Sequence, residues 1–373
     1  MLDPCYVGKN IRKHREKLNI TQQELSQKLF VSFQAVSAWE RGLSLPDLEN
    51  TAKLSKIFGI KIDTLLSDEC GTHYIAVDGG GTKTEFVLFD KNGTIKKRIF
   101  LPGSNPNDKS IDNSISVLQN GIDELISLHS AKAIFAGIAG VTTGDHIPNL
   151  QKALIDKYGI KVKVDTDAVN VLCLGSDIAN SASVICGTGS CLFIRKNYEL
   201  TRLGGWGYLF DRGGSSYDIG NDAIRHTLAV NDGLEEPTLL SQKIEETLGG
   251  NIWKNLSTVF RKGRPYIASF APTVVECEMQ GDKTSAQILD ENAKRLATLI
   301  KSAVDKHNAP REFIAAGGFF NNLTFKKRVE NFSDTKLITP DMPPVYGAAV
   351  ECMRLIGLTA NEEFKKNFKE SYR

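Results

Sequence analysis

Two segments of this 373-residue chain space their hydrophobic residues differently. Across residues 7–66 the apolar positions recur every three or four residues, as Leu25 and Leu29 do, which is typical of amphipathic helices. From residue 74 onward, short β-rich runs alternate with helical stretches. The chain is therefore expected to begin with a small all-α domain and to continue as an α/β protein.

The α/β segment contains strands and helices whose positions the pattern predicts. Residues 74–78 and 85–89 are expected to form apolar strands, and the Asn-Gly pair at 92–93 indicates a hairpin turn. Further strands are predicted at 133–138, 162–164 and 184–185, and helices at 111–128 and 147–158.

Capping signals mark the helices of the first segment. Thr21 and Glu24 are expected to form a capping box, in which each side chain accepts a hydrogen bond from the other residue's backbone amide. Ser32 is expected to cap a third helix, Pro46 to start a fourth, and Gly59 to end that one. The first segment is thus predicted to hold short helices joined by tight turns.

The third helix has an inner and an outer face. Val36 and Trp39 are predicted to face the core together because they lie three residues apart on a helix. Trp39 is therefore a core residue rather than a stacking platform. Phe33, Gln34 and Ser37 are expected on the outside.

Residues 11–66 resemble the helix-turn-helix module of the Cro/C1-type (XRE) regulators. The matching residues lie at 21–25, 31–32, 36–37 and 39–42. The resemblance implies a homodimer whose third helix reads the major groove of a double-stranded DNA operator. Its candidate DNA contacts are Gln22 and Gln23 at phosphates, and Ser32, Phe33, Gln34 and Ser37 on the reading helix. Gln34 is favoured for base reading because glutamine can bond adenine bidentately. The alternative is a helical bundle that contacts only proteins.

Three glycine-rich loops each follow an apolar strand of the second segment. In the first, at 79–84, the glycines let successive backbone amides point at one anion, and the hydroxyls of Thr82 and Thr84 add donors. It is not a Walker loop, and by itself it is equally consistent with a tight turn. The candidate nucleotide-binding residues of the three loops are Gly79, Gly80, Gly81, Thr82, Lys83, Thr84, Gly187, Thr188, Gly189, Gly317 and Gly318.

The order of these loops resembles the two phosphate loops and the adenosine loop of the actin/hexokinase/heat-shock-protein superfamily. Within it, the chain resembles the BadF/BadG/BcrA/BcrD-type ATPases and N-acetylglucosamine kinases over residues 73–355, on matches at 203–207, 214–217 and 346–349. The resemblance implies a two-lobed actin-like ATPase (ribonuclease H-like) fold of the α/β class, behind a small all-α helix-turn-helix domain. The expected domains are 1–67 for the helix-turn-helix, 68–72 for a linker, 73–177 for the first lobe with the helix of 345–373 packed back on it, and 178–344 for the second lobe.

The resemblance also implies ATP-dependent phosphoryl transfer to a sugar, with ATP and Mg²⁺ as cofactors. Such transfer needs a carboxylate that accepts the proton of the sugar hydroxyl. By its match to the T-D-A segment of these kinases, Asp167 is the candidate catalytic base, whereas Asp165 lies on the opposite face of an extended segment. The alternative role for Asp167 is to cap the following helix. Asp78 resembles the carboxylate that holds Mg²⁺ through water.

A further group of residues matches the part of these kinases that binds the sugar. Asn105 stands where the kinases bond a sugar hydroxyl, and the Gly-Gly-Trp-Gly segment brings backbone amides and an indole to the sugar. The kinases usually continue with Gly-Asp-Glu-Gly-Ser, but here Asp211 comes one place early and Arg212 occupies the acidic slot, which suits an acidic sugar. The candidate sugar-binding residues are Asn105, Gly204, Gly205, Trp206, Gly207, Asp211 and Arg212.

The composition of the chain bears on its net charge, the state of its cysteines and its location in the cell. Charged residues make up 24% of the chain, hydrophobic ones 41%, and the net charge is +2, so no global attraction to nucleic acid follows. The seven cysteines are scattered without a C-x-x-C pair, which predicts reduced thiols rather than a disulfide framework or a zinc site. No apolar run is long enough to span a membrane and no secretory signal is visible, so a cytoplasmic protein is expected.

Three functions are compatible with these features. The first is an amino-sugar kinase of the N-acetylglucosamine type, whose DNA-binding head makes it a sugar-responsive transcriptional regulator. The second is a regulator that senses sugar or ATP without turnover, in a layout similar to that of the ROK-type repressors. The third is an activator ATPase of a radical dehydratase, which holds an iron–sulfur cluster through cysteines. The first function is favoured by the presence of Asp78, Thr188 and Asp167, whereas Arg212 favours divergence from it. The scattered cysteines disfavour the third function.

Overall fold

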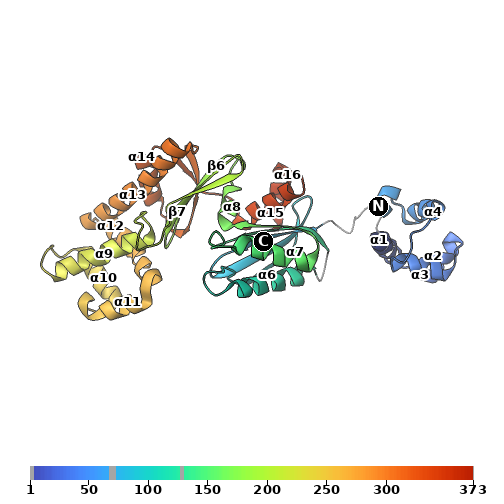
Figure 1. Cartoon of the computed structure of the whole chain (residues 1–373), viewed down its shortest axis with the longest axis horizontal. Coiled ribbons are helices and arrows are strands. Elements are labelled where there is room, and N and C mark those ends of the chain that lie inside the picture. The colour runs from blue at the N-terminus through green and yellow to red at the C-terminus, as the bar shows by residue number, and fades with distance from the viewer. Residues whose placement is uncertain (1–3, 67–72, 127–129, 373) are drawn as a thin grey trace. The chain divides into compact units, whose positions relative to one another are not determined.

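The computed structural model describes residues 4–66, 73–126 and 130–372 of the chain. Contacts divide the chain into two compact units, one comprising 1–136, 141–164 and 352–373 and the other 137–140 and 165–351. A helical head and a first sheet belong to the first unit, and a second sheet belongs to the second (Figure 1). The linker predicted at 68–72 lies outside the described residues, and the predicted bounds of the two lobes stay predictions.

The helical head is built from short helices around a small apolar core. They are α1 (Pro4–Lys17), α2 (Gln22–Leu29), α3 (Phe33–Glu40), α4 (Leu48–Phe58) and α5 (Ile62–Leu66). The capping box of Thr21 and Glu24 at the start of α2 is confirmed, and so is the Ser32 cap of α3. The predicted inward residues are all buried, namely Leu25, Leu29, Val36 and Trp39.

The start of α4 lies two residues after the predicted one. Leu48, and not Pro46, begins this helix, because the residue before it, Asp47, is the N-terminal cap, whose carboxylate accepts a hydrogen bond from the Asn50 amide at 2.7 Å. Aspartate is a strong N-terminal cap, and the proline merely precedes it. Gly59 ends the helix in the left-handed region with φ 66°, as predicted.

The first sheet has the strand order β3-β2-β1-β4-β5. Its strands are β1 (His73–Gly79), β2 (Lys83–Asp90), β3 (Ile95–Pro102), β4 (Ala131–Ile138) and β5 (Lys161–Thr166). Strands β1, β2 and β3 pair antiparallel. Helices α6 (Ile111–Ile126) and α7 (His146–Tyr158) cover one side of this sheet, and α16 (Glu362–Ser371) covers the other (Figure 1).

Side chains of β2 pack against helices on both faces of the first sheet. The Phe86 ring packs so closely on α6 that a Cβ at Gly121 would come within 2.5 Å of it. Phe89 instead meets Phe364 of α16 edge to face, with 5.8 Å between ring centroids. Successive strand residues point to opposite faces, so this one strand anchors helices on both sides of the sheet.

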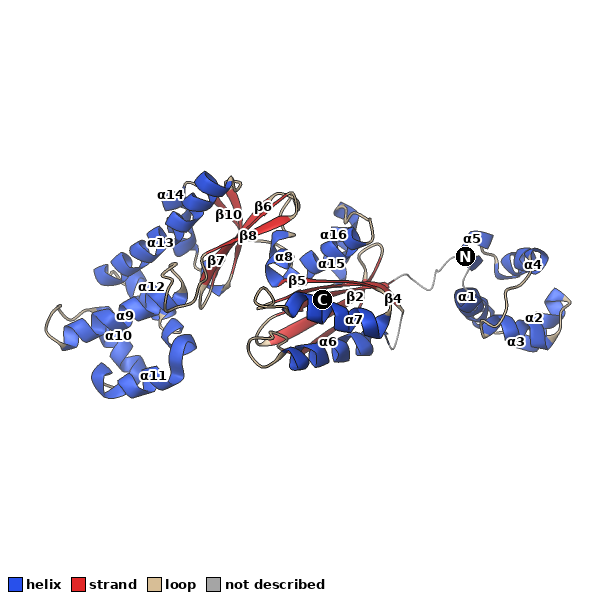
Figure 2. Ribbon diagram, viewed as in Figure 1, coloured by secondary structure: helices blue, strands red, loops and turns tan. Residues whose placement is uncertain are grey.

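The second sheet has the strand order β10-β9-β6-β7-β8. Its strands are β6 (Ser181–Cys186), β7 (Ser190–Lys196), β8 (Glu199–Leu203), β9 (Glu312–Ala316) and β10 (Lys336–Ile338). Helices surround this sheet and extend beyond it (Figure 2). They are α8 (Asp167–Leu172), α9 (Ser216–Asn231), α10 (Leu239–Leu248), α11 (Ile252–Ala268), α12 (Ala271–Met279), α13 (Lys283–His307), the 3₁₀ helix η1 (Gly318–Asn321) and α14 (Leu323–Ser333), with α15 (Pro344–Leu355) following β10.

The α/β elements predicted from the pattern are all present, with strands longer than predicted by one or more residues at their ends. The expected helix at 111–128 is described as far as Ile126, and its last two residues lie outside the described part. None of the helices in the described ranges combines the length and the apolar character needed to cross a membrane.

Candidate functional site

The outer side of α3 carries most of the predicted DNA contacts. Phe33 and Gln34 are exposed, Ser37 is half-buried, and Ser32 is exposed at the helix start. Gln23 is exposed on α2. These side chains remain available to a partner outside the head, so they stay candidates for DNA contact.

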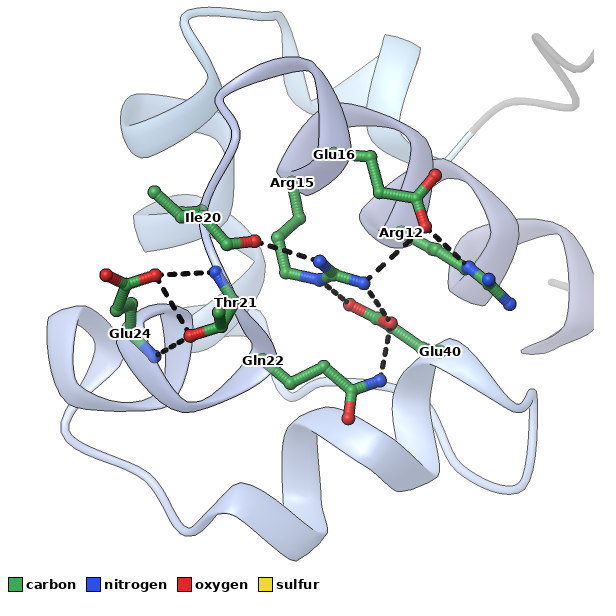
Figure 3. A network of polar contacts seen from close by, with 8 residues as sticks. All are labelled: Arg12, Arg15, Glu16, Ile20, Thr21, Gln22, Glu24 and Glu40. Carbon is green, nitrogen blue, oxygen red and sulfur yellow. Dashed lines mark hydrogen bonds and ion pairs between the residues drawn. The ribbon is translucent and has the colours of Figure 1, made fainter.

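Gln22 belongs to a polar network inside the head (Figure 3). Its Nε2 donates to Glu40 Oε2 at 2.7 Å, and Arg15 Nε donates to Glu40 Oε1 at 2.6 Å. The charged side chains are largely covered, with 12% of Arg15 and 2% of Glu40 exposed. The hydrogen bond to Glu40 raises the pKa of Arg15. Because these residues come from α2, α1 and the end of α3, the network fixes the reading helix within the head.

The first glycine loop joins β1 to β2. Thr82 and Lys83 are exposed at its tip, whereas Thr84 is fully buried. Thr84 Oγ1 lies 3.0 Å from the Pro102 carbonyl oxygen and 2.9 Å from Ser104 Oγ. The prediction that Thr84 offers a donor to phosphate is therefore wrong in this structure, because its hydroxyl is enclosed by the fold and shapes the loop.

The segment around Asn105 packs directly against the first glycine loop. A Cβ at Gly103 would come within 1.9 Å of the Gly81 carbonyl oxygen, so the contact requires glycine. It places the half-buried Asn105, whose Oδ1 accepts the Asn107 amide at 3.0 Å, in the segment beside this loop. Asp78 is half-buried in β1, one residue before the first glycine of the loop. The first sheet thus gathers a candidate sugar contact, a candidate metal ligand and a phosphate loop.

The second and third glycine loops lie side by side because β6 and β9 are parallel neighbours. Gly317 has φ 95°, and a Cβ there would lie 2.3 Å from the Cys186 carbonyl oxygen, so this glycine permits the close contact of the loops. A Cβ at Gly187 or Gly318 would instead meet nothing within 4 Å. Thr188, which follows Gly187 in the second glycine loop, is exposed. Open space beside glycine backbone is what a nucleotide cradle requires.

Asp167 is the first residue of α8, directly after β5. Thr166 caps this helix, since its Oγ1 accepts the Ala168 amide at 3.4 Å, so the alternative that Asp167 is the cap is wrong. Thr166 Oγ1 also lies 3.1 Å from Asp167 Oδ1. Burial raises the pKa of Asp167, and hydrogen bonds from Thr166 and the backbone lower it in part. A carboxylate with a raised pKa is suited to accept a proton in the reaction.

The Gly-Gly-Trp-Gly loop is held from both sides. Asp211 Oδ2 accepts the amide of Gly205 at 2.5 Å and that of Trp206 at 3.2 Å. Arg202 donates from Nε to the Gly204 carbonyl at 3.1 Å and from Nη2 to the Gly205 carbonyl. The carboxylate that sequence analysis assigned to the sugar is therefore engaged with the loop backbone, and its role in this structure is to shape the loop.

Arg212 is also engaged by the protein. Its Nη2 lies 2.6 Å from Asp222 Oδ1 on α9, and Asp222 Oδ2 pairs with Arg295 at 2.8 Å. Trp206 is 66% exposed at the end of its loop. A cavity of about 190 Å³ opens beside this loop and the second glycine loop, lined by residues that include Ser190, Cys191, Tyr208, Asp211, Tyr217 and Arg264.

Comparison with known proteins identifies both parts of the chain. Residues 75–352 match the BadF/BadG/BcrA/BcrD ATPase family, and residues 11–65 match the helix-turn-helix family. The chain belongs to the BadF/BadG/BcrA/BcrD ATPase family. It carries a helix-turn-helix domain ahead of the ATPase body, and both predicted resemblances are confirmed. Membership of this family implies the use of ATP.

Individual relatives of this ATPase are sugar kinases. The N-acetylmuramic acid/N-acetylglucosamine kinase of Clostridium acetobutylicum is 30% identical over 298 residues, which cover 74% of this chain and 97% of the relative. The structure of a candidate N-acetylglucosamine kinase from Chromobacterium violaceum matches with a TM-score of 0.61 at 21% identity, over 75% of this chain and 98% of its own. A ROK family transcriptional regulator, homologous to MLC of Escherichia coli, matches with a TM-score of 0.50 at 13% identity over 99% of each chain. The two structural matches establish the sugar-kinase-like fold alone.

Two arginines of this ATPase line the cavity and were not predicted. Arg202 holds the Gly-Gly-Trp-Gly loop, and Arg264 Nη2 donates to the Thr188 carbonyl at 3.4 Å. The local signal for Arg264 is the sequence Gly-Arg-Pro at 263–265, which predicts an interrupted helix. It gives no indication of contact with a loop so distant in the chain.

Proposed function

We propose that this chain phosphorylates an amino sugar of the N-acetylglucosamine type with ATP and Mg²⁺, and that its helix-turn-helix head makes it a sugar-responsive transcriptional regulator acting as a homodimer. The observation that carries the kinase proposal is the combination, in one compact unit, of a raised-pKa carboxylate at Asp167 with the open glycine backbone at Gly187. The names of the relatives support the same substrate class.

In this proposal each loop has a distinct task. Asp167 accepts the proton of the attacking sugar hydroxyl. The second and third glycine loops bind the nucleotide through backbone amides, with open space at Gly187 and Gly318 for phosphate and adenosine. In the second unit the Gly-Gly-Trp-Gly loop holds the sugar, and the engagement of Asp211 with that loop keeps its backbone in one conformation. In the first unit Asn105 is a separate candidate for contact with a sugar hydroxyl.

The residues present also fit Mg²⁺ bound mainly by phosphate and water. No group of three or more His, Cys, Asp or Glu side chains gathers as a metal site within the described ranges. Mg²⁺ usually keeps several waters and binds one or two carboxylates together with substrate phosphates, and Asp78 at the end of β1 suits that role. Bound there, the metal neutralises charge on the phosphate oxygens.

The ion pair of Arg212 bears on whether the preferred sugar is acidic or neutral. Sequence analysis linked this arginine to an acidic sugar, but in the structure its guanidinium pairs with Asp222. An acidic sugar would have to compete with that carboxylate, so we expect a neutral amino sugar to be the better substrate. The Clostridium acetobutylicum relative is named for both N-acetylmuramic acid and N-acetylglucosamine, which makes these two sugars a direct comparison.

An ADP-release assay tests the kinase proposal. The intact protein is supplied with ATP, Mg²⁺ and one of N-acetylglucosamine, N-acetylmuramic acid, N-acetylmannosamine or glucose, with no sugar as the blank. We expect release above the blank with N-acetylglucosamine, and a smaller release with the acidic sugar. Sugar and ATP binding measured by calorimetry, together with no release for any sugar, would overturn the kinase and leave a non-catalytic sensor.

A further inference from the structure

A break in α11 places an arginine on the second glycine loop. Gly263 has φ 66° and ψ −158° within this helix, a conformation that L side chains rarely adopt, and Pro265 follows it closely. Between them, Arg264 extends to the loop, and a Cβ at Gly189 would lie 2.3 Å from Arg264 Nη2. The helix geometry is thus interrupted at the position where the guanidinium meets the loop.

The guanidinium of Arg264 has no negative partner in the described part of the chain. Its Nη2 reaches only the Thr188 carbonyl, at 3.4 Å, and its Nε is buried without a hydrogen-bond partner. The Tyr208 ring lies 5.8 Å from its central carbon. Arginine stays charged at all physiological pH values, and a buried N–H without a partner is unfavourable. The site is therefore suited to an anion that the protein itself does not supply.

The two carboxylates that line the same cavity are already committed to the backbone. Asp211 accepts the amides of the Gly-Gly-Trp-Gly loop, and Asp218 Oδ2 accepts the Ser215 amide at 2.8 Å. Asp211 fixes the loop and Asp218 completes the capping box of α9, and neither carboxylate pairs with Arg264 in the described part of the chain. The cavity of about 190 Å³ between them opens onto the second glycine loop through Gly189 and Ser190.

We propose that Arg264 binds the terminal phosphate of the nucleotide at the second glycine loop. The proposal rests on the proposed function, because it assumes that ATP occupies this loop. Backbone amides of a glycine loop and a planar guanidinium are the two donor types that recognise phosphate oxygens most specifically. ADP lacks the terminal phosphate, so Arg264 distinguishes the two nucleotides.

Calorimetry of the intact protein with Mg²⁺ and either ADP or the non-hydrolysable analogue AMPPNP tests the assignment. We expect Arg264→Gln to weaken AMPPNP binding by about 10- to 100-fold, as for the loss of a charge-assisted hydrogen bond, and to leave ADP binding nearly unchanged. Equal effects on both nucleotides, or none on either, would overturn the assignment. So would a variant that binds AMPPNP normally but loses binding of inorganic phosphate to the ADP complex, since the anion would then be free phosphate.

Three further variants keep the test informative. Arg261→Gln removes an exposed arginine from the same helix and is expected to change neither affinity. Gly263→Ala adds a Cβ that meets nothing within 4 Å, so its expected loss of AMPPNP affinity reports the backbone break and not a clash. Arg264→Lys keeps the charge without the fork and is expected to fall between wild type and Arg264→Gln. Thermal unfolding of each variant excludes loss of the fold as the cause.

The outcomes also separate this inference from the proposed function. A wild-type protein that binds both nucleotides but releases no ADP with any sugar loses the kinase assignment, while the Arg264 comparison still decides the phosphate assignment. A wild-type protein that binds neither nucleotide overturns both.

Discussion

The helix-turn-helix head and the ATPase body differ in how one covered arginine of each is partnered. In the head, Arg15, Gln22 and Glu40 pair with one another inside the fold, and the side chains left for a partner lie on the surface. In the body, Gly187 faces open space and Arg264 Nε is buried without a partner. A head whose helices are tied together by this network suits docking onto DNA as a rigid unit. A body with unmet donors around a cavity suits a small anionic ligand.

The largest expected effect is on catalysis in the body. We expect Asp167→Asn to lower kcat by about 10²- to 10⁴-fold, because the amide cannot accept the proton of the sugar hydroxyl. Calorimetry should show ATP binding close to wild type, and DNA binding by the head should be unchanged. A variant with near-normal kcat would contradict the assignment of the base.

The pH dependence of the wild-type enzyme sharpens the same assignment. Burial raises the pKa of Asp167 above its ordinary value of 3.8. The base works only when deprotonated, so activity should be lost as the pH falls through that raised pKa and retained above it. The acid limb of kcat/KM should therefore lie above pH 3.8, and a limb at or below that value would remove Asp167 from this role.

The head should respond most to loss of its internal ion pair. Glu40→Gln leaves the largely covered Arg15 with only its longer ion pair to Glu16, at 3.8 Å, and we expect the head to be destabilised by about 2 kcal/mol. This expected loss of stability is smaller than that for breaking a fully buried ion pair, because Arg15 keeps some contact with solvent. Chemical denaturation measures it, and kinase activity of the body should persist. The matched control is Arg12→Gln, which removes an exposed pair with Glu16 and should leave the denaturation midpoint unchanged.

Substitutions at two glycines of the body are expected to affect ligand binding and folding separately. A Cβ added at Gly187 meets nothing within 4 Å, so for Gly187→Val we expect a nearly normal melting temperature and an ATP affinity lower by about tenfold or more. Gly317→Ala places a Cβ 2.3 Å from a backbone oxygen at φ 95°, so we expect the fold itself to be destabilised. Calorimetry and thermal unfolding on both variants check the contrast. Unchanged ATP affinity in Gly187→Val would take this loop out of the site.

The smallest of these effects concerns the first cap of the head. Thr21→Ala removes one half of the capping box and should cost about 1 kcal/mol of head stability. Thr21→Ser keeps the hydroxyl and should lie within a few tenths of a kcal/mol of wild type. Equal losses in both variants would show that packing of the methyl group, and not the cap, supports α2.

Sequence reasoning succeeded where the interactions are local. The capping box at Thr21, the core position of Trp39 and the order of the glycine loops depend on residues a few places apart, and the structure has all of them. The start of α4 lies two residues beyond the one that Pro46 predicts, because aspartate at position 47 is the stronger capping signal.

It failed where distant segments meet. The hydroxyl of Thr84 is enclosed by Pro102 and Ser104, which the pairing of β2 with β3 brings to it. The Asp211 contact is short in sequence, but its partners are amides that the loop folds back onto it, and the motif alone does not indicate them. Arg264 reaches Thr188 from another helix, so no local pattern predicts the contact.

The most direct test of the central claim, that one chain couples sugar binding to DNA binding, is operator affinity measured with and without sugar. Fluorescence anisotropy of the intact protein on a DNA operator selected from random sequences is recorded at fixed salt, since phosphate contacts make binding salt-dependent. The account predicts that a sugar accepted by the kinase changes operator affinity by about 5- to 150-fold, and that the operator changes sugar affinity by the same factor. Identical operator affinity with and without every accepted sugar would contradict it.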